Sequence, residues 1–169
     1  MRPFVGFVFE GGQHSGDVEG WVAQAREEMA ILLARRLVDT DLLDRVVFVT
    51  DRPSLAERAA SLAKVDTAVT PAQSASPFHF GRRLAQVIAE YDAAGFVYMS
   101  GGSGLLMSMD ELAGFVLATQ ERPGSIVANN VYSADMFGAA DSQAALCTEL
   151  PAADNGVPMA AHAAGIPVY

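Results

Sequence analysis

The sequence predicts an α/β fold in which helices cover both faces of an open, mostly parallel sheet. The hydrophobic pattern changes repeatedly from short apolar runs, typical of buried strands, to apolar residues at helical spacing. The connecting segments are short, and strands that alternate with helices build a parallel sheet with a helix in each crossover. The 169 residues contain no internal repeat and no linker. We therefore expect a single three-layer domain over residues 1–169.

Five strands are predicted, each a short apolar run closed by turn residues: residues 5–10, 45–51, 65–71, 96–99 and 125–130. A helix follows each of the first four. Capping boxes open the second helix, with Ser54 and Glu57, and the fourth, with Ser108 and Glu111. The first helix carries an apolar stripe that we expect to face the sheet: Val18, Trp21, Val22, Ala25, Met29, Leu32, Leu33 and Leu37.

The pattern weakens after Asn130, where turn residues and one modest apolar stretch predict no element. Residues 157–169, VPMAAHAAGIPVY, predict a short helix that ends at Gly165 and then a strand-like run. Because the sequence stops inside that run, at Tyr169, we expect the domain to lack its usual C-terminal part.

Composition argues against several classes of protein. No apolar run approaches the ~18 residues needed to cross a bilayer, and no signal-peptide cleavage site follows the first residues, so we expect a cytoplasmic protein without a membrane partner. The formal net charge of −9 disfavours a nucleic-acid partner, because such a surface repels a phosphate backbone. Cys147 is the only cysteine, which excludes an internal disulfide and predicts a small buried thiol.

Ligands of such a sheet bind beyond the carboxyl ends of its strands. After the first strand, Gly11 and Gly12 offer backbone amides that can approach a phosphate beside a helix N-terminus, with an ordinary βα turn as the alternative. Arg82 and Arg83, near the start of the third helix, can bind phosphate, or can point to solvent or to acidic neighbours.

A second small-residue turn follows the fourth strand and contains Gly101, Gly102, Ser103 and Gly104. Its backbone amides could surround an anion without any charged side chain. The turn does not match the GxSxG nucleophile elbow, because Leu105 stands where the last glycine is needed. We therefore favour an anion-binding loop over a serine hydrolase.

Polar residues also end the fifth predicted strand. Asn129 and Asn130 are costly there unless they bind a ligand or build a turn. Asp135 follows them and could hold a divalent cation together with a second carboxylate such as Asp154. A turn cap is the competing interpretation of Asp135.

In their succession, these segments resemble the nucleotidyltransferases of the glycosyltransferase-A fold. Among the members of this family, the chain resembles the molybdenum-cofactor guanylyltransferases and the 2-phospholactate guanylyltransferases. The resemblance covers nearly the whole chain and implies a nucleotide-diphospho-sugar transferase-like sheet, a nucleoside triphosphate or nucleotide sugar as ligand, and Mg²⁺ as cofactor. The segments that carry it are VFEGG, RVVFVTD, FHFGRRLAQVIAEY, FVYMSGGSGLLMSMDEL, VANNVYSADMFG, LPAADNG and AAGIPVY.

The resemblance also assigns roles and exposes departures. Gly11 and Gly12 stand in the place of the family's nucleotide-binding loop, and FGRRL resembles the segment beside the base and ribose. In the family, the fourth strand leads to a magnesium-binding aspartate, whereas this chain has only glycines and Ser103 there. The first loop also lacks the family's arginine and lysine, and a further aspartate of the family would lie beyond Tyr169.

Three functions are therefore expected as alternatives. The first is transfer of a nucleoside monophosphate to a small phosphorylated acceptor with release of pyrophosphate, with Asp135 as the catalytic metal ligand. The second is a non-catalytic nucleotide-binding or scaffolding relative, which the missing aspartate and loop cations favour. The third is a Rossmann-like dinucleotide binder in which Asp51 binds a ribose, although the chain lacks GxGxxG.

Overall fold

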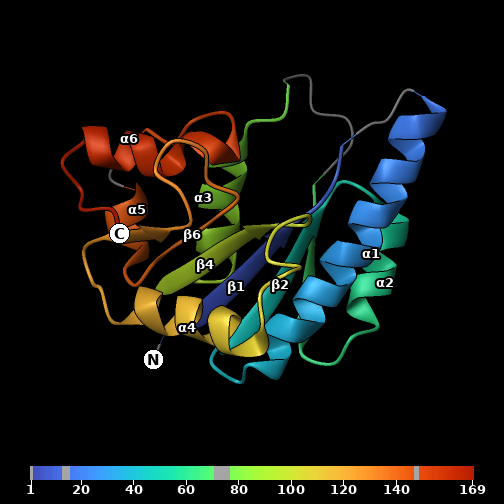
Figure 1. Ribbon diagram of the computed structural model, residues 1–169, viewed down its shortest axis with the longest axis horizontal. Coiled ribbons are helices and arrows are strands. Elements are labelled where there is room, and N and C mark those ends of the chain that lie inside the picture. Colours follow the sequence, from blue (N-terminus) through green and yellow to red (C-terminus); the bar gives the residue numbers. More distant parts are fainter. Residues whose placement is uncertain (1, 13–15, 71–76, 147–148) are drawn as a thin grey trace.

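The computed structural model describes residues 2–12, 16–70, 77–146 and 149–169, and Cys147 and the predicted strand end at Pro71 lie outside them. Strands and helices alternate through most of the chain (Figure 1). In order, the elements are β1 Phe4–Phe9, α1 Asp17–Asp39, β2 Arg45–Thr50, α2 Pro53–Ala60, β3 Val65–Val69, α3 Phe80–Glu90, β4 Gly95–Ser100, α4 Met109–Gln120, β5 Ile126–Ala128, β6 Met136–Ala139, α5 Ser142–Leu146, the 3₁₀ turn η1 Asp154–Gly156 and α6 Val157–Ala163.

The sheet has the strand order β3-β2-β1-β4-β6-β5. Strand β1 lies at its centre and pairs in parallel with β2 and β4, while β2 pairs in parallel with β3. Strand β6 runs antiparallel to both of its neighbours, β4 and β5. The carboxyl ends of β1 to β4 therefore meet at one edge of the sheet, and the predicted mostly parallel sheet is confirmed.

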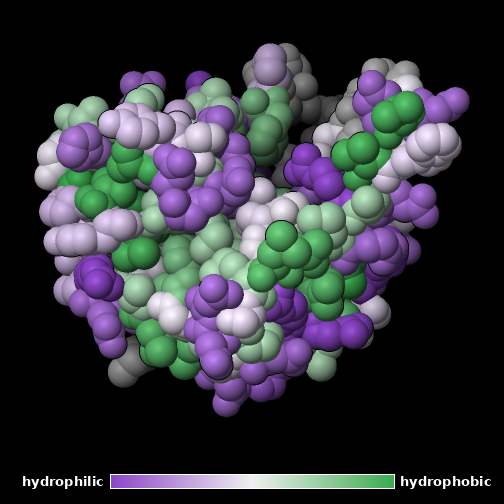
Figure 2. Space-filling view, in the orientation of Figure 1, coloured by the Kyte–Doolittle hydropathy of each residue, from purple (hydrophilic) through white to green (hydrophobic). Residues whose placement is uncertain are grey.

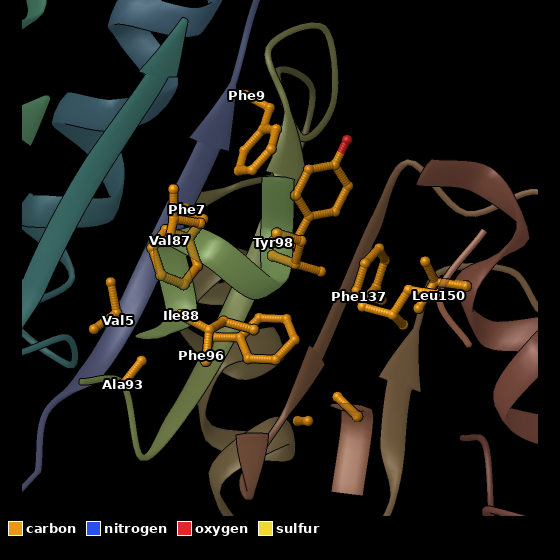
Figure 3. Close-up of a cluster of buried hydrophobic side chains, with 14 of the residues drawn as sticks. Val5, Phe7, Phe9, Val87, Ile88, Ala93, Phe96, Tyr98, Phe137 and Leu150 are labelled. Carbon is orange, nitrogen blue, oxygen red and sulfur yellow. The ribbon is translucent and has the colours of Figure 1, made fainter. Parts of the chain in front are cut away.

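Helices cover both faces of the sheet, and each face has its own hydrophobic core (Figure 1). Helices α3, α5 and α6 pack on one face, where side chains from β1 and β4 such as Phe7 and Phe96 meet Val87 and Ile88 of α3 (Figure 3). Helices α1, α2 and α4 pack on the other. Because successive residues of a strand point to opposite faces, β1 supplies both cores.

The sequence analysis missed strand β6. Its four residues are all buried, so they show none of the polar–apolar alternation that marks a half-buried strand. Gly138 is required within it, because a Cβ there would lie 2.7 Å from the backbone oxygen of Phe96. The predicted fifth strand, residues 125–130, is correspondingly shorter: β5 ends at Ala128, and β6 separates it from β4.

The predicted stripe of α1 is confirmed only at Leu33 and Leu37. The buried residues of this helix are Ala23, Ala30, Leu33, Ala34 and Leu37. Most of the larger residues of the predicted stripe face outward, and Trp21 is 72% exposed. Three of the five buried residues are alanines, which let the helix lie close to the sheet.

Local signals at the helix ends were partly correct. The capping box of Ser108 and Glu111 is confirmed, with hydrogen bonds of 2.7 and 3.2 Å between backbone and side chains. The box of Ser54 and Glu57 is wrong, because α2 begins one residue earlier, at Pro53, without a side-chain cap. A proline in the first helical turn needs no hydrogen-bond partner for its nitrogen.

The predicted C-terminal helix is present as α6, and Gly165 follows it with a φ of 82°. The strand-like run after Gly165 forms a single parallel bridge between Ile126 and Val168. Among the described residues, no helix is long and apolar enough to span a bilayer.

Candidate functional site

A pocket of about 670 Å³ lies at the carboxyl ends of β1 to β4, the edge that the sequence analysis selected. Both faces of the sheet contribute to it, because α1 approaches from one side and the segment after α5 from the other. The described residues that line it are Phe9, Glu10, Gly11, Gly12, Arg26, Val49, Thr50, Asp51, Thr70, Pro77, Phe78, Phe80, Tyr98, Ser100, Ala152, Ala153 and Asp154.

The glycines after β1 form one wall of the pocket. The Asp51 carboxylate accepts a hydrogen bond from the Gly12 amide, at 3.2 and 3.3 Å from its two oxygens. A Cβ at Gly11 would lie 2.4 Å from Asp51 Oδ1, and Gly12 has a φ of 108°. Only glycine satisfies both constraints, and the resulting bare backbone lets a ligand approach closely. In this structure, Asp51 holds the glycine turn against the end of β2.

Aromatic residues form the floor of the pocket. Phe80, from the start of α3, packs edge-on against Tyr98 at a centroid distance of 4.8 Å, and Phe9 packs against both. Phe78 lies at the rim and is 61% exposed. Exposed aromatic rings beside a concave surface are typical of sites that stack on a planar ligand group.

Two carboxylates lie near the end of β4. The Tyr98 hydroxyl, which points out of the packed rings in Figure 3, donates a 2.5 Å hydrogen bond to Asp154 Oδ2. The Asp135 carbonyl accepts from the Ser100 amide at 2.9 Å. Burial raises the pKa of Tyr98 well above its usual value, and the negative charges of Asp154 and Asp135 raise it further. The structure therefore brings both predicted metal ligands toward the same strand end.

Two arginines near the end of β1, Arg26 and Arg52, were not among the predicted site residues. Glu10 follows β1, and its side chain is only 1% exposed. Its Oε2 lies 3.2 Å from the guanidinium of Arg26 on α1, and its Oε1 lies 3.7 Å from Arg52. Arg52 also pairs with Glu27. Burial raises the pKa of Glu10, and the neighbouring Arg26 and Arg52 partly offset that rise.

Arg26 would have been difficult to recognise from sequence alone. It lies on the same side of α1 as the buried residues Ala23 and Ala30, which are three and four residues away. The prediction instead assigned the sheet-facing side mainly to larger apolar residues. Glu10 did carry a signal, because an acid that ends an apolar strand has to be paired or solvated. The sequence analysis treated Glu10 only as the end of the strand.

The small-residue turn after β4 lies beside the pocket. Ser100 belongs to the described pocket lining, but the turn residues that follow it do not. The Gly101 amide donates to the Phe9 carbonyl and the Ser103 amide to the Ser100 carbonyl, so these two amides are already in use. The Ser103 hydroxyl also donates to the Ser100 carbonyl, at 2.8 Å. Gly104 has a φ of 67° and lies in the segment that leads to α4.

The rest of this turn is held against α1. Arg36 donates to the carbonyls of Gly104, Leu105 and Met107. The outer side of the turn is apolar, and Figure 2 shows hydrophobic residues gathered there; Leu106 is 97% exposed.

The other predicted ligand residues lie outside the pocket lining. Arg82 is exposed, and its amide donates to the side chain of His79, which caps α3. Arg83 lies behind the pocket, where it donates to the Thr70 hydroxyl at 2.9 Å and pairs with Glu90. Its position lets it orient Thr70 rather than contact a ligand directly.

The two asparagines shape the connection between β5 and β6. The Asn130 side chain accepts from the amides of Tyr132 and Ser133, and the Asn129 side chain accepts from those of Asp135 and Met136. These bonds build turns, which is one of the two roles predicted for them. They also fix the backbone that carries Asp135.

The acidic groups fit a divalent cation only in part. Asp154 and Asp135 come from two loops near one strand end, but no cluster of three or more His, Cys, Asp or Glu residues forms a metal site within the described ranges. Mg²⁺ commonly uses one or two carboxylates and completes its octahedron with water and substrate phosphates. Asp154 accepts hydrogen bonds from the Tyr98 hydroxyl and the Asn155 amide, and Asp135 is exposed, so a cation here would need water and a phosphorylated ligand to complete its coordination.

Comparison with solved structures establishes the fold. The chain is similar to CMP:2-keto-3-deoxy-manno-octonic acid synthetase complexed with CTP, with a TM-score of 0.63 and 11% identity over 98% of this chain and 88% of that one. It is equally similar in shape to 4-diphosphocytidyl-2C-methyl-D-erythritol synthase, with a TM-score of 0.63 and 10% identity over 99% and 87% of the two chains.

A third similar structure is Rv0371c from Mycobacterium tuberculosis H37Rv in complex with manganese, with a TM-score of 0.57 and 20% identity over 98% and 85% of the chains. No protein-family model matches the sequence, and a comparison with curated proteins finds no match. The chain therefore has the three-layer nucleotide-diphospho-sugar transferase-like fold predicted from its sequence.

Proposed function

We propose that this protein binds a nucleoside triphosphate or nucleotide sugar in the pocket beyond β1 to β4, as a nucleotidyltransferase-like protein. The observation that carries the proposal is the position of that pocket. A bare glycine turn, an aromatic floor and the Asp154 carboxylate line it at the strand ends where ligands of open α/β sheets bind, and Asp135 lies near the end of β4. The similar structure bound to CTP supports a nucleotide as the ligand.

In the proposed arrangement each wall has a separate task. The Gly11–Gly12 backbone lies close against the nucleoside, and the rim aromatic Phe78 stacks on its base. Arg26 binds the phosphate chain. Asp135 and Asp154 would hold Mg²⁺, which when bound neutralises phosphate charge and so assists transfer. The manganese complex of the similar Rv0371c structure supports a divalent metal, with Mg²⁺ as our proposal for this chain.

The reaction we propose is transfer of a nucleoside monophosphate. A phosphate oxygen of a small acceptor attacks the α-phosphorus, the bond from that phosphorus to the bridging oxygen breaks, and pyrophosphate leaves with the bonding electrons. Such transfer depends mainly on positioning and on neutralisation of charge. The charged side chains in the described lining are Glu10, Asp51, Asp154 and Arg26, so acids outnumber cations there. Nucleotide binding should therefore depend strongly on the metal.

The experiment is a calorimetric titration with GTP and with CTP, each with and without Mg²⁺. We expect binding of at least one nucleotide in the presence of Mg²⁺, and a loss of affinity of roughly 10–100-fold in Asp135→Asn and Asp154→Asn. Asp39→Asn is the matched control, because Asp39 is an exposed acid at the far end of α1. No binding to the unaltered protein at millimolar nucleotide would refute the proposal.

A non-catalytic relative that retains the fold and binds nucleotide without reaction is the second candidate. The turn after β4 favours it, because it carries no carboxylate and is tied down by Arg36. Release of pyrophosphate in the presence of mixed sugar-phosphate and cofactor-phosphate acceptors distinguishes the two. Sustained release that Asp135→Asn abolishes would exclude the non-catalytic candidate, and nucleotide binding without release would support it.

A further inference from the structure

The buried carboxylate of Glu10 and the half-exposed guanidinium of Arg26 form an unusual ion pair at the pocket wall. Glu10 is 1% exposed, whereas the side chain of Arg26 is 48% exposed. Arg26 Nε and Nη2 both lie 3.2 Å from the same oxygen, Oε2. The other oxygen, Oε1, has no hydrogen-bond partner within the described part of the chain, although Arg52 lies 3.7 Å away. A buried carboxylate is therefore held mainly through one partner whose own side chain is half exposed.

The space around Glu10 explains why it is buried. Its side chain lies over Gly101 of the neighbouring strand end, where an added Cβ would be 2.3 Å from Oε2. Any larger residue at position 101 would push the carboxylate away from Arg26. Glycine at this position therefore leaves space for the Glu10 carboxylate beside Arg26.

Arg26 lines the pocket and borders open space beside Gly102. A Cβ built on Gly102 would have Arg26 Nε as its nearest neighbour, at 3.9 Å, and no other described atom lies within 4 Å of it. Arg52 is different, because its side chain is 21% exposed and it also pairs with Glu27 and Asp51. Of the two arginines beside Glu10, Arg26 is the one that can turn toward a ligand.

We propose that Arg26 is a movable anion-binding side chain. It pairs with Glu10 before a ligand binds, and on binding it leaves Glu10 and pairs with a phosphate group of the ligand. This inference deepens the proposed nucleotide site and relies on it only for the nature of the ligand. A phosphate carries more charge than a carboxylate and can accept two parallel hydrogen bonds from the guanidinium. It therefore competes effectively for Arg26.

The exchange has a consequence for protons. When Arg26 leaves, ionised Glu10 loses its nearest cation inside a buried site, and protonation relieves that cost. The other charged groups around it are Glu27 on α1, which disfavours ionisation, and Arg52 and Asp51 at the end of β2. Asp154 and Asp135 lie beyond Tyr98. Anion binding should therefore be accompanied by proton uptake at Glu10.

The test is calorimetric titration of inorganic pyrophosphate, and separately of GTP and CTP with Mg²⁺, in two buffers of different ionisation enthalpy near pH 7. The variants are Arg26→Gln, Glu10→Gln and the control Arg35→Gln, an exposed arginine on the same helix. We expect Arg26→Gln to weaken binding at least about tenfold. Glu10→Gln should bind about three- to tenfold more tightly, because Arg26 no longer has to leave a charged partner.

Proton uptake separates a ligand-exchange role from a structural one. The unaltered protein and Arg35→Gln should take up more protons per bound pyrophosphate than Glu10→Gln. The Glu10→Gln titration measures the protons that pyrophosphate itself gains or loses on binding. Equal uptake in the unaltered protein and Glu10→Gln would overturn the role of Glu10. Thermal melting of each variant checks that it is folded, and Arg26→Lys, which keeps the charge, should retain part of the affinity.

The outcomes also separate this inference from the proposed function. Nucleotide binding that Arg26→Gln leaves unchanged would overturn the inference and leave the nucleotide proposal intact. Pyrophosphate binding that depends on Arg26, without nucleotide binding, would support the inference and refute the nucleotide proposal. Binding of neither ligand would overturn both.

Discussion

Tyr98 joins the aromatic floor to the acidic side of the pocket. Its ring is 1% exposed, and its hydroxyl donates to Asp154 at 2.5 Å. Tyr98→Phe keeps the ring but leaves a carboxylate oxygen without its donor. We expect the free energy of unfolding at pH 7 to fall by about 1–3 kcal/mol, the range for hydrogen bonds to charged groups. Chemical denaturation measures it, with Tyr132→Phe as the control, because Tyr132 is an exposed tyrosine.

The same substitution has a defined effect at alkaline pH. Burial and two nearby carboxylates raise the pKa of Tyr98 above 10, so the folded state keeps its proton when an unfolded tyrosine has lost it. Stability from this residue is present below about pH 10 and is lost as pH rises further. The unaltered protein should lose more stability than Tyr98→Phe between pH 9 and 11. Equal losses would show that Tyr98 ionises normally.

At the level of single residues, the sequence predicted the positions that backbone geometry controls. Gly11 and Gly12 line the pocket, because turns after parallel strands meet at one edge of the sheet. Asp154 also lines it, but from the 3₁₀ turn η1. Arg26 and Glu10 could not be found in this way. Their contact depends on which face of α1 packs on the sheet, and the predicted stripe of large apolar residues placed most of that face elsewhere. Whether Asp135 and Asp154 bind a metal remains a prediction.

Among the elements, the start of α3 controls the position of the acidic wall. The amides of Phe80 and Gly81 donate to the carbonyls of Ala152 and Pro151. A Cβ at Gly81 would lie 2.4 Å from the Cβ of Leu150. We therefore expect Gly81→Ala to force the two segments apart and to lower the free energy of unfolding by about 1–3 kcal/mol. Because Asp154 follows this segment, metal-dependent nucleotide affinity should fall as well.

Gly114→Ala is the matched control for that substitution. Gly114 is exposed within α4, and an added Cβ there meets no described atom within 4 Å. Alanine is favoured over glycine in a helix, so this variant should be more stable by about 0.5–1 kcal/mol. Thermal melting and nucleotide titration of both variants provide the measurement. A Gly81→Ala protein as stable as Gly114→Ala would contradict the docking of α3 on residues 150–152.

The strands and helices were predictable wherever a run was long enough to show a period. The parallel strands β1 to β4, the three helices that connect them and helix α4 after β4 were all located from their apolar patterns. Strand β6 was not, because it contains four buried residues with a glycine among them. Its antiparallel insertion between β4 and β5 depends on pairing between distant segments, which local pattern does not specify.

Over the whole molecule, one sheet joins two hydrophobic cores. Helices α3, α5 and α6 complete the first, and α1, α2 and α4 complete the second. Alternate residues of the same strands supply both cores. Loss of packing in one core would therefore disturb strands that the other core also uses. The pocket lies where the two meet, and Glu10 with α1 on one side and Asp154 on the other reach it from different layers.

Unfolding should therefore be a single cooperative transition. Leu84→Ala removes a buried side chain from the first core and Leu112→Ala removes one from the second. Each cavity should cost about 2–5 kcal/mol, and both should shift the same transition in far-UV circular dichroism and in near-UV circular dichroism, which reports buried aromatic side chains such as Tyr98. The double variant should lose nearly the sum, because the two sites lie on opposite faces of the sheet. Two separate transitions, each sensitive to only one substitution, would mean that the cores unfold independently and that the pocket can open along the sheet.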